Sequence, residues 1–129
     1  MAEKLVIDAS AMVDYLVGSP LAGRVAERIT DNEIFVPAHF DAEVLSALGR
    51  LQRGGVLSEA QVEERLALTA QAPFHRELLG PLLEGAWARH HNVRLVDALY
   101  IELANRVDAT LITTDSGMSA ASDDAEHIE

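Results

Sequence analysis

Two aspartates each follow a short apolar run that is typical of a buried strand. Asp8 follows the run at 4–7, and Asp115 comes just after the run at 109–113. In open α/β sheets, ligands bind at the carboxyl ends of parallel strands, so both carboxylates would lie on the functional edge of such a sheet. An aspartate after a strand can equally cap the next helix. For each aspartate taken alone, both interpretations remain open.

Two further acids lie near the starts of helical patterns. Glu43 falls in the first turn of a helix expected at 40–53, and Asp97 opens a helix expected at 95–107. Each has a structural alternative, because acids favour the positive end of a helix and aspartate is a good cap. However, the neighbours of Glu43 are mostly apolar, and an acid that borders a buried face needs a partner. The helix at 95–107 is so apolar that we expect its N-terminus, and Asp97 with it, to point inward toward the sheet edge.

The four carboxylates of Asp8, Glu43, Asp97 and Asp115 suit one kind of chemistry if they meet. Acids that are forced together repel one another, and some take up protons unless a cation neutralises them. Oxygen ligands suit Mg²⁺ or Mn²⁺ better than zinc, and the chain has no cysteine. A divalent ion can deprotonate a water at neutral pH and stabilise charge on a transferring phosphate. The four acids therefore indicate metal-assisted phosphodiester hydrolysis.

The elements that would position these acids alternate between strand and helix. We expect strands at 4–7, 33–36 and 109–113, a strand or loop at 74–79, a last edge strand near Ile128, and helices at 11–17, 19–29, 40–53, 58–70, 82–91, 95–107 and 116–121. Ser58 and Gln61 match a capping box. Alternation of this kind predicts a parallel sheet with helices on both faces. We therefore expect one domain over 1–129, of the α/β class, with three α/β/α layers and a central, mostly parallel sheet.

Composition bounds the kind of protein. The chain has 129 residues, of which 49% are hydrophobic, enough for one domain with its own core. The N-terminus lacks the long apolar run of a secretory signal, and no stretch reaches the ~20 apolar residues of a membrane span. We therefore expect a cytoplasmic protein that does not associate with membranes.

The net charge of −11 is unusual for an enzyme that binds nucleic acid, because backbone binding normally uses Lys and Arg. The acids are unevenly distributed, however. Four lie in the last seven residues, namely Asp123, Asp124, Glu126 and Glu129, and four are the candidate site acids. Without these eight the net charge would be only −3, so the composition does not exclude a nuclease.

Four segments together resemble the PIN-domain family of ribonucleases. They are Leu-Val-Ile-Asp-Ala-Ser-Ala at 5–11, Phe-Val-Pro at 35–37 with Glu-Val-Leu-Ser-Ala-Leu at 43–48, Val-Asp-Ala-Leu-Tyr-Ile-Glu-Leu-Ala at 96–104, and Ala-Thr-Leu-Ile-Thr-Thr-Asp at 109–115. Each segment is a weak signal alone, but the four occur in the family's order and spacing over nearly the whole chain. The branch that the chain resembles most in size is the VapC-type toxin of bacterial toxin–antitoxin pairs.

The resemblance implies an endoribonuclease that needs Mg²⁺ or Mn²⁺, a small antitoxin that blocks its site, and a homodimer. By position, Asp8, Glu43, Asp97 and Asp115 correspond to the family's acidic quartet. Asp8, Asp97 and Asp115 would hold the metal, while Glu43 would help to bind it or orient the attacking water. Thr113 matches the family's threonine two residues before the last acid. Ser10 lies where a small polar residue often assists near the first acid.

The chain departs from the family pattern after the last acid. A basic residue often follows that acid in the family, whereas here Asp115 is followed by Ser116 and Gly117. An expected phosphate contact is therefore missing. The resemblance then implies that RNA contacts come from arginines, and the candidates are Arg24, Arg28, Arg50, Arg53 and Arg94.

Other residues and functions receive weaker support. We expect His39, His90 and His91 to be surface residues, because adjacent histidines on a helix do not converge on one metal. Trp87 and Tyr100 are expected in the core or at a dimer contact. Two alternative functions remain: a non-catalytic binding module that keeps the fold and acts through a protein partner, and, third, a DNA-directed or flap-type nuclease, for which the chain lacks extra length.

Overall fold

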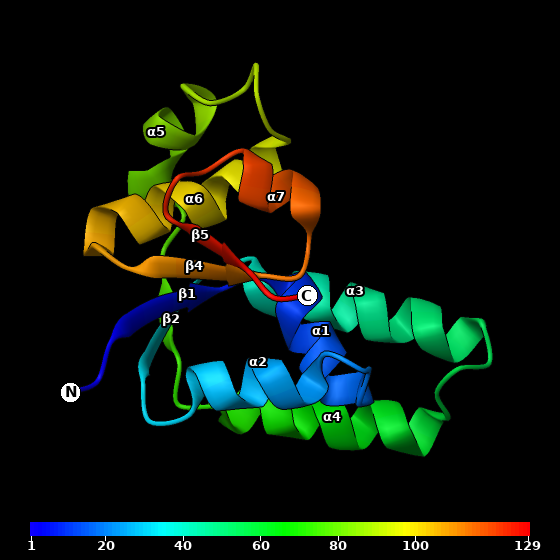
Figure 1. The fold of residues 1–129 in the computed structure, drawn as a ribbon. Helices are drawn as coiled ribbons and strands as arrows, with labels where there is room; N and C mark the ends of the chain where they lie inside the picture. The colour runs from blue at the N-terminus through cyan, green and yellow to red at the C-terminus, as the bar shows by residue number, and fades with distance from the viewer.

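A five-stranded sheet between two layers of helices forms the centre of the computed structural model, which describes the whole chain from Met1 to Glu129 (Figure 1). The strands are β1 (Lys4–Ile7), β2 (Glu33–Pro37), β3 (His75–Glu77), β4 (Thr110–Thr113) and β5 (Ala125–His127), in the order β3-β2-β1-β4-β5. Every neighbouring pair is parallel. The predicted α/β/α architecture is confirmed, and the sheet expected to be mostly parallel is entirely so.

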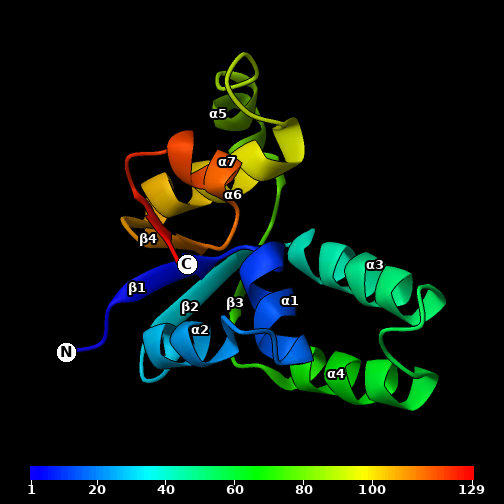
Figure 2. The same cartoon turned by 45° about the vertical axis from the view of Figure 1, so that its right-hand side comes forward.

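The helices divide between the two faces of the sheet. One layer holds α1 (Ala9–Val17), α2 (Ala22–Ile29), α3 (Phe40–Arg53) and α4 (Glu59–Gln71). The other holds α5 (Leu83–Trp87), α6 (Leu95–Val107) and α7 (Ser116–Ala120). Figure 2 shows α3 and α4 side by side, extending beyond the edge of the sheet. No helix combines the length and the apolar character needed to cross a membrane.

The core explains the apolar runs in the sequence. Leu5, Val6 and Ile7 of the central strand β1 are fully buried, because helices cover both faces of a parallel sheet. Helix α6 packs against β1, β2 and β4, and the seven residues at 98–104 are all buried. This burial matches the expectation that the helix at 95–107 would be the most deeply placed.

Most predicted elements are present. The helices expected at 40–53 and 95–107 are α3 and α6, and the uncertain segment at 74–79 contains the edge strand β3. The capping box at the start of α4 forms, with Ser58 and Gln61 each bonding the other's backbone N–H. The last strand, β5, ends just before Ile128.

Three helices begin or end two or more residues away from their predicted boundaries. Helix α1 begins at Ala9 instead of 11, because Asp8 caps it. Helix α2 begins at Ala22 instead of 19, because 19–22 form a turn closed by the bond from the Ala22 N–H to the Ser19 carbonyl. The helix expected at 82–91 is present but shorter, because a 3₁₀ turn at Gly80–Leu82 leads into α5, which ends at Trp87.

A turn follows the end of α5. The Trp87 carbonyl oxygen accepts the His90 backbone N–H at 3.0 Å, and the His90 ring stacks on the Trp87 ring. Trp87 itself is 59% exposed and so does not lie in the core, while its expected place at a dimer contact stays a prediction. Leu45 and Leu95 lie at the helical spacing of the apolar residues in α3 and α6, yet their side chains are also exposed.

The order of the strands marks a functional edge. From β1 the chain continues through α1 and α2 to β2 on one side, whereas β4 pairs with β1 on the other side and leads through α7 to β5. The β1–β4 boundary is thus the point where the direction of strand addition reverses. Ligands bind outside the carboxyl ends of the strands at such a switch point. Asp8 and Asp115 follow these two strands.

Candidate active site

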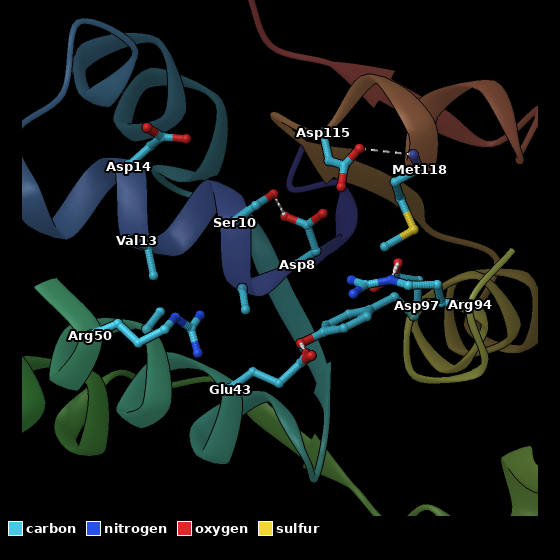
Figure 3. A pocket seen from close by; sticks show the side chains of 13 residues that line it. Asp8, Ser10, Val13, Asp14, Glu43, Arg50, Arg94, Asp97, Asp115 and Met118 are labelled. Carbon is cyan, nitrogen blue, oxygen red and sulfur yellow. Dashed lines mark hydrogen bonds and ion pairs between the residues drawn. The ribbon is translucent and has the colours of Figure 1, made fainter.

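A pocket of about 330 Å³ lies at this edge, and all four predicted carboxylates line it. Figure 3 shows Asp8 and Asp115 on one side, Glu43 on the other, and Arg50 and Arg94 toward opposite ends. The remaining lining residues are Ala9, Ser10, Val13, Asp14, Ala47, Asp97, Tyr100 and Met118. Four acids that are far apart in the sequence therefore share one cavity, as the sequence predicted.

Asp8 is both a helix cap and a wall of the pocket. Its Oδ1 accepts hydrogen bonds from the Ala11 N–H (2.9 Å) and the Ser10 hydroxyl (2.8 Å). The side chain is almost fully buried. Burial raises the pKa of Asp8, the three hydrogen bonds that it accepts oppose this rise, and the nearby charge of Asp115 adds to it. A cation nearby would stabilise the ionised form of this buried carboxylate, which burial disfavours.

Thr113 connects the two aspartates of the switch point. The Thr113 side chain is fully buried and donates its hydroxyl proton to Asp8 Oδ2, while its oxygen accepts the Asp115 backbone N–H at 2.9 Å. This single hydroxyl therefore fixes the Asp8 carboxylate relative to the backbone that carries Asp115. The structure places Thr113 as a positioning residue behind the acids.

Asp115 is anchored through one oxygen only. Asp115 Oδ1 accepts the backbone N–H groups of Gly117 (2.8 Å) and Met118 (3.3 Å) at the start of α7, so this aspartate also caps a helix. Oδ2 accepts no hydrogen bond from the protein. One oxygen is thus held in place, and the other is available to a ligand.

Glu43 is held from across the sheet by α6. The Tyr100 hydroxyl donates to Glu43 Oε1 at 2.6 Å, and burial, with the Glu43 carboxylate itself, raises the pKa of Tyr100 so that the hydroxyl keeps its proton. His39 Nε2 lies 3.5 Å from the same oxygen and 2.9 Å from the Val96 carbonyl oxygen. Because a carbonyl only accepts, Nε2 must carry the ring proton. Oε2 of Glu43 remains unbonded.

Asp97 differs from the other three acids because an arginine occupies both of its oxygens. Arg94 Nε lies 2.9 Å from Oδ2, and Arg94 Nη2 lies 3.2 Å from Oδ1. The Asp97 side chain is only 15% exposed and, as expected, points into the pocket. It makes no capping bond, since the cap position of α6 is Arg94.

The donor set fits a hard divalent cation in type, although it is not assembled around one. The carboxylate oxygens of Asp115 and Glu43 that make no hydrogen bond are the ligands that Mg²⁺ and Mn²⁺ prefer. No three His, Asp or Glu side chains lie close enough together to hold an ion as they stand. Mg²⁺ usually keeps several waters and uses one or two carboxylates directly, so a wider arrangement still suits it.

The structure separates the five candidate arginines. Arg50 and Arg94 line the pocket, whereas Arg24 and Arg53 do not. Arg28 does not line the pocket either. It pairs with Glu3 and Glu126 and so links the start of the chain to its last strand. Arg28 is therefore a structural residue.

Several residues that line the pocket or contact its acids were not predicted. Asp14 lines the pocket and accepts a 2.7 Å bond from the Thr114 hydroxyl. Its place within the apolar run Ala-Met-Val-Asp-Tyr-Leu-Val was a signal that we could have used. His39 was expected on the surface, but its side chain is only 14% exposed and faces Glu43. Tyr100 is indeed core, yet the sequence gave no sign of its bond to Glu43.

The fold defines a class of protein, an α/β/α protein with a parallel sheet, and comparison with known proteins agrees with this class. The family described as PIN domain matches residues 5–123. Ribonuclease VapC3 of Mycobacterium tuberculosis is 48% identical over 120 residues, which cover 92% of this chain and 88% of that protein. The chain therefore belongs to the PIN-domain family, in the branch of the VapC ribonucleases.

Solved structures share the fold at low sequence identity. The sarcin-ricin loop cleaving toxin VapC20 of Mycobacterium tuberculosis superposes with a TM-score of 0.67 and 16% identity, covering 91% of this chain and 94% of that one. A toxin–antitoxin complex from Klebsiella pneumoniae gives a TM-score of 0.63 and 17% identity, covering 95% of each chain. These likenesses concern the fold alone.

Proposed function

We propose that this protein is a Mg²⁺- or Mn²⁺-dependent endoribonuclease that acts as the toxin of a toxin–antitoxin pair. The observation that carries the proposal is the meeting of Asp8, Glu43, Asp97 and Asp115 in one pocket at the switch point of the sheet. Membership of the VapC branch supports RNA as the substrate, and the fold shared with a toxin–antitoxin complex supports a protein antitoxin. A homodimer is part of the same proposal.

The proposed roles of the acids follow the acidic quartet of the family, and Asp115 and Glu43 each also keep one oxygen that makes no hydrogen bond. Asp8, Asp97 and Asp115 would hold the cation, and Glu43, fixed by Tyr100 through one oxygen, would use the other to bind the cation or to orient the attacking water. The bound cation would supply a hydroxide at neutral pH and stabilise charge on the phosphate. Thr113 and Ser10 keep Asp8 in place throughout, because each donates a hydrogen bond to it.

Phosphate binding would fall to the two arginines of the pocket. Ser116 and Gly117 follow Asp115, so no basic side chain is supplied there. Arg50 is held by the Ser46 hydroxyl at 2.8 Å, and Arg94 lies beside Asp97 (Figure 3). Arginine suits this role because its planar guanidinium can bind a phosphate through two hydrogen bonds. Few aromatic residues line the pocket, so base stacking would contribute little.

The test is cleavage of a mixed RNA pool with Mg²⁺ or Mn²⁺, with wild type beside Asp97→Asn. Asp108→Asn is a matched control, because Asp108 is an exposed residue at the other end of the same helix. We expect metal-dependent cleavage by wild type and by the control, and loss of cleavage in Asp97→Asn. No cleavage by the antitoxin-free wild type with any metal or RNA class would favour a non-catalytic binding module instead.

A further inference from the structure

The pairing of Arg94 with Asp97 sets one predicted metal ligand apart. Asp8, Glu43 and Asp115 accept hydrogen bonds from neutral hydroxyl or backbone groups, whereas Asp97 gives both oxygens to a guanidinium. A metal ion that binds Asp97 would therefore compete with Arg94 for the same carboxylate oxygens. Since Arg94 and the metal are both cations, the two would neutralise the same carboxylate.

Arg94 lies among the acids as a whole. The pKa of Arg94 is raised first by its hydrogen bonds to Asp97 and also by the charges of Glu43 and Asp115. Met118 lies next to it in the pocket (Figure 3). The acids thus already have a cation beside them, which lowers the repulsion between them when no metal is bound.

The two partners differ in how freely they can move. The Asp97 side chain is 15% exposed, whereas the Arg94 side chain is 75% exposed. The backbone of Arg94 is fixed as the cap of α6, but its long side chain can rotate into solvent without leaving a cavity. Breaking the pair therefore disturbs no packing and frees a guanidinium at the mouth of the pocket.

We propose that Arg94 is a built-in counter-ion of the acidic pocket, which leaves Asp97 when a divalent cation binds and then contacts an RNA phosphate. This inference rests on the proposed metal-dependent function. It has a thermodynamic consequence: metal binding frees Arg94 for the phosphate, so RNA should strengthen metal binding by the same factor by which the metal strengthens RNA binding.

The first experiment measures Mn²⁺ binding by isothermal titration calorimetry and by the electron paramagnetic resonance signal of free Mn²⁺, in the absence of RNA. Arg94→Ala is compared with wild type and with Arg50→Ala. Both variants remove one positive charge from the same pocket, but Arg50 contacts Ser46 and no carboxylate. The comparison separates the Arg94–Asp97 contact from the change in net charge.

We expect Arg94→Ala to bind Mn²⁺ roughly 1.5- to 5-fold more tightly than wild type, the range for an ion pair with one exposed partner, and Arg50→Ala to change less. Equal effects of the two variants, or weaker binding by Arg94→Ala, would overturn the inference and leave the metal site intact. Binding by none of the three proteins would overturn the metal site and the inference together.

A second measurement tests the link to RNA. Anisotropy of a labelled single-stranded 2′-O-methyl oligonucleotide, checked for intactness on a gel, gives RNA affinity with and without Mn²⁺. Wild type and Arg50→Ala should bind the oligonucleotide more tightly with Mn²⁺, and Arg94→Ala should lose most of this enhancement. An enhancement that persists in Arg94→Ala would show that Arg94 does not contact the phosphate.

Discussion

Replacing Thr113 by valine should lower the free energy of unfolding, because it removes one hydroxyl while keeping almost the same volume. That hydroxyl donates to Asp8 and accepts the Asp115 N–H, and the side chain is fully buried. A hydrogen bond to a charged group contributes about 1.5–3 kcal/mol and a neutral one about 1 kcal/mol, so we expect a loss of about 2–4 kcal/mol. A domain typically has about 5–15 kcal/mol of stability, so the variant should still fold.

The assay is urea denaturation of the metal-free protein at pH 7, with Thr113→Ser as the control. Serine keeps the hydroxyl and loses a methyl group, which costs roughly 1 kcal/mol. The bond from Thr113 lowers the pKa of Asp8, so it stabilises the ionised carboxylate. The difference between the variants should therefore be present above the pKa of Asp8 and shrink as the pH falls through it. Equal stabilities of Thr113→Val and Thr113→Ser at pH 7 would refute this account.

Three further predictions concern the residues around the site and a buried ion pair. Tyr100→Phe removes the 2.6 Å bond to Glu43, so calorimetry should show roughly tenfold weaker Mn²⁺ binding with the fold kept. Mn²⁺ affinity should also fall on acidification, beginning above the ordinary pKa of an aspartate, because burial raises the pKa of Asp8 and a ligand must be deprotonated. Gly85→Ala should cost about 1–3 kcal/mol in thermal unfolding, because its Cβ would lie 2.1 Å from the Glu102 carboxyl carbon.

Each of these predictions has a result that would contradict it. Unchanged Mn²⁺ affinity in Tyr100→Phe would mean that Glu43 does not bind the cation, and a pH-independent affinity would argue against Asp8 as a ligand. Gly23→Ala is the control for Gly85→Ala, because a Cβ on Gly23 meets nothing within 4 Å and alanine favours the helix. If both alanine variants had the same melting temperature, Glu102 would not be held rigidly.

Glu102 is held because two arginines bind it. Arg89 and Arg106 contact its two oxygens at 3.2 and 2.9 Å, and the carboxylate is only 10% exposed. Arg106 lies four residues after Glu102 on the same helix, which is the usual spacing of a helical ion pair. The sequence did not indicate Arg89, because Arg89 lies in the turns after α5 that were predicted as helix. The Arg89–Glu102 pair depends on that irregular segment, which periodicity does not describe.

The site acids were predictable because their positions follow from the strands. Asp8 and Asp115 come at the ends of apolar runs, and parallel strands bring their carboxyl ends to one edge. Capping and pocket lining were treated as alternatives, yet Asp8 and Asp115 do both. One oxygen of a carboxylate can cap a helix while the other faces the cavity, and a one-dimensional pattern does not distinguish the two oxygens.

The long-range partners of the acids were not predictable. Tyr100 approaches Glu43 from α6 across the gap to α3, and nothing in the local sequence records that approach. His39, in contrast, lies only four residues before Glu43. The exposure of some apolar residues could not be predicted for a related reason. Leu45 and Leu95 follow the helical period of a buried face, but no element of this chain covers them.

The bond between Thr113 and Asp8 joins residues 105 positions apart, and it forms only when β4 has paired with β1. A chain that is still being synthesised, or that ends before β4, lacks both this bond and Asp115. Contacts of such long range also form late in folding, because a large loop must close first. The pocket therefore cannot be completed by any N-terminal fragment. A cell that makes this chain would therefore contain a complete pocket only after nearly all of the chain had been synthesised.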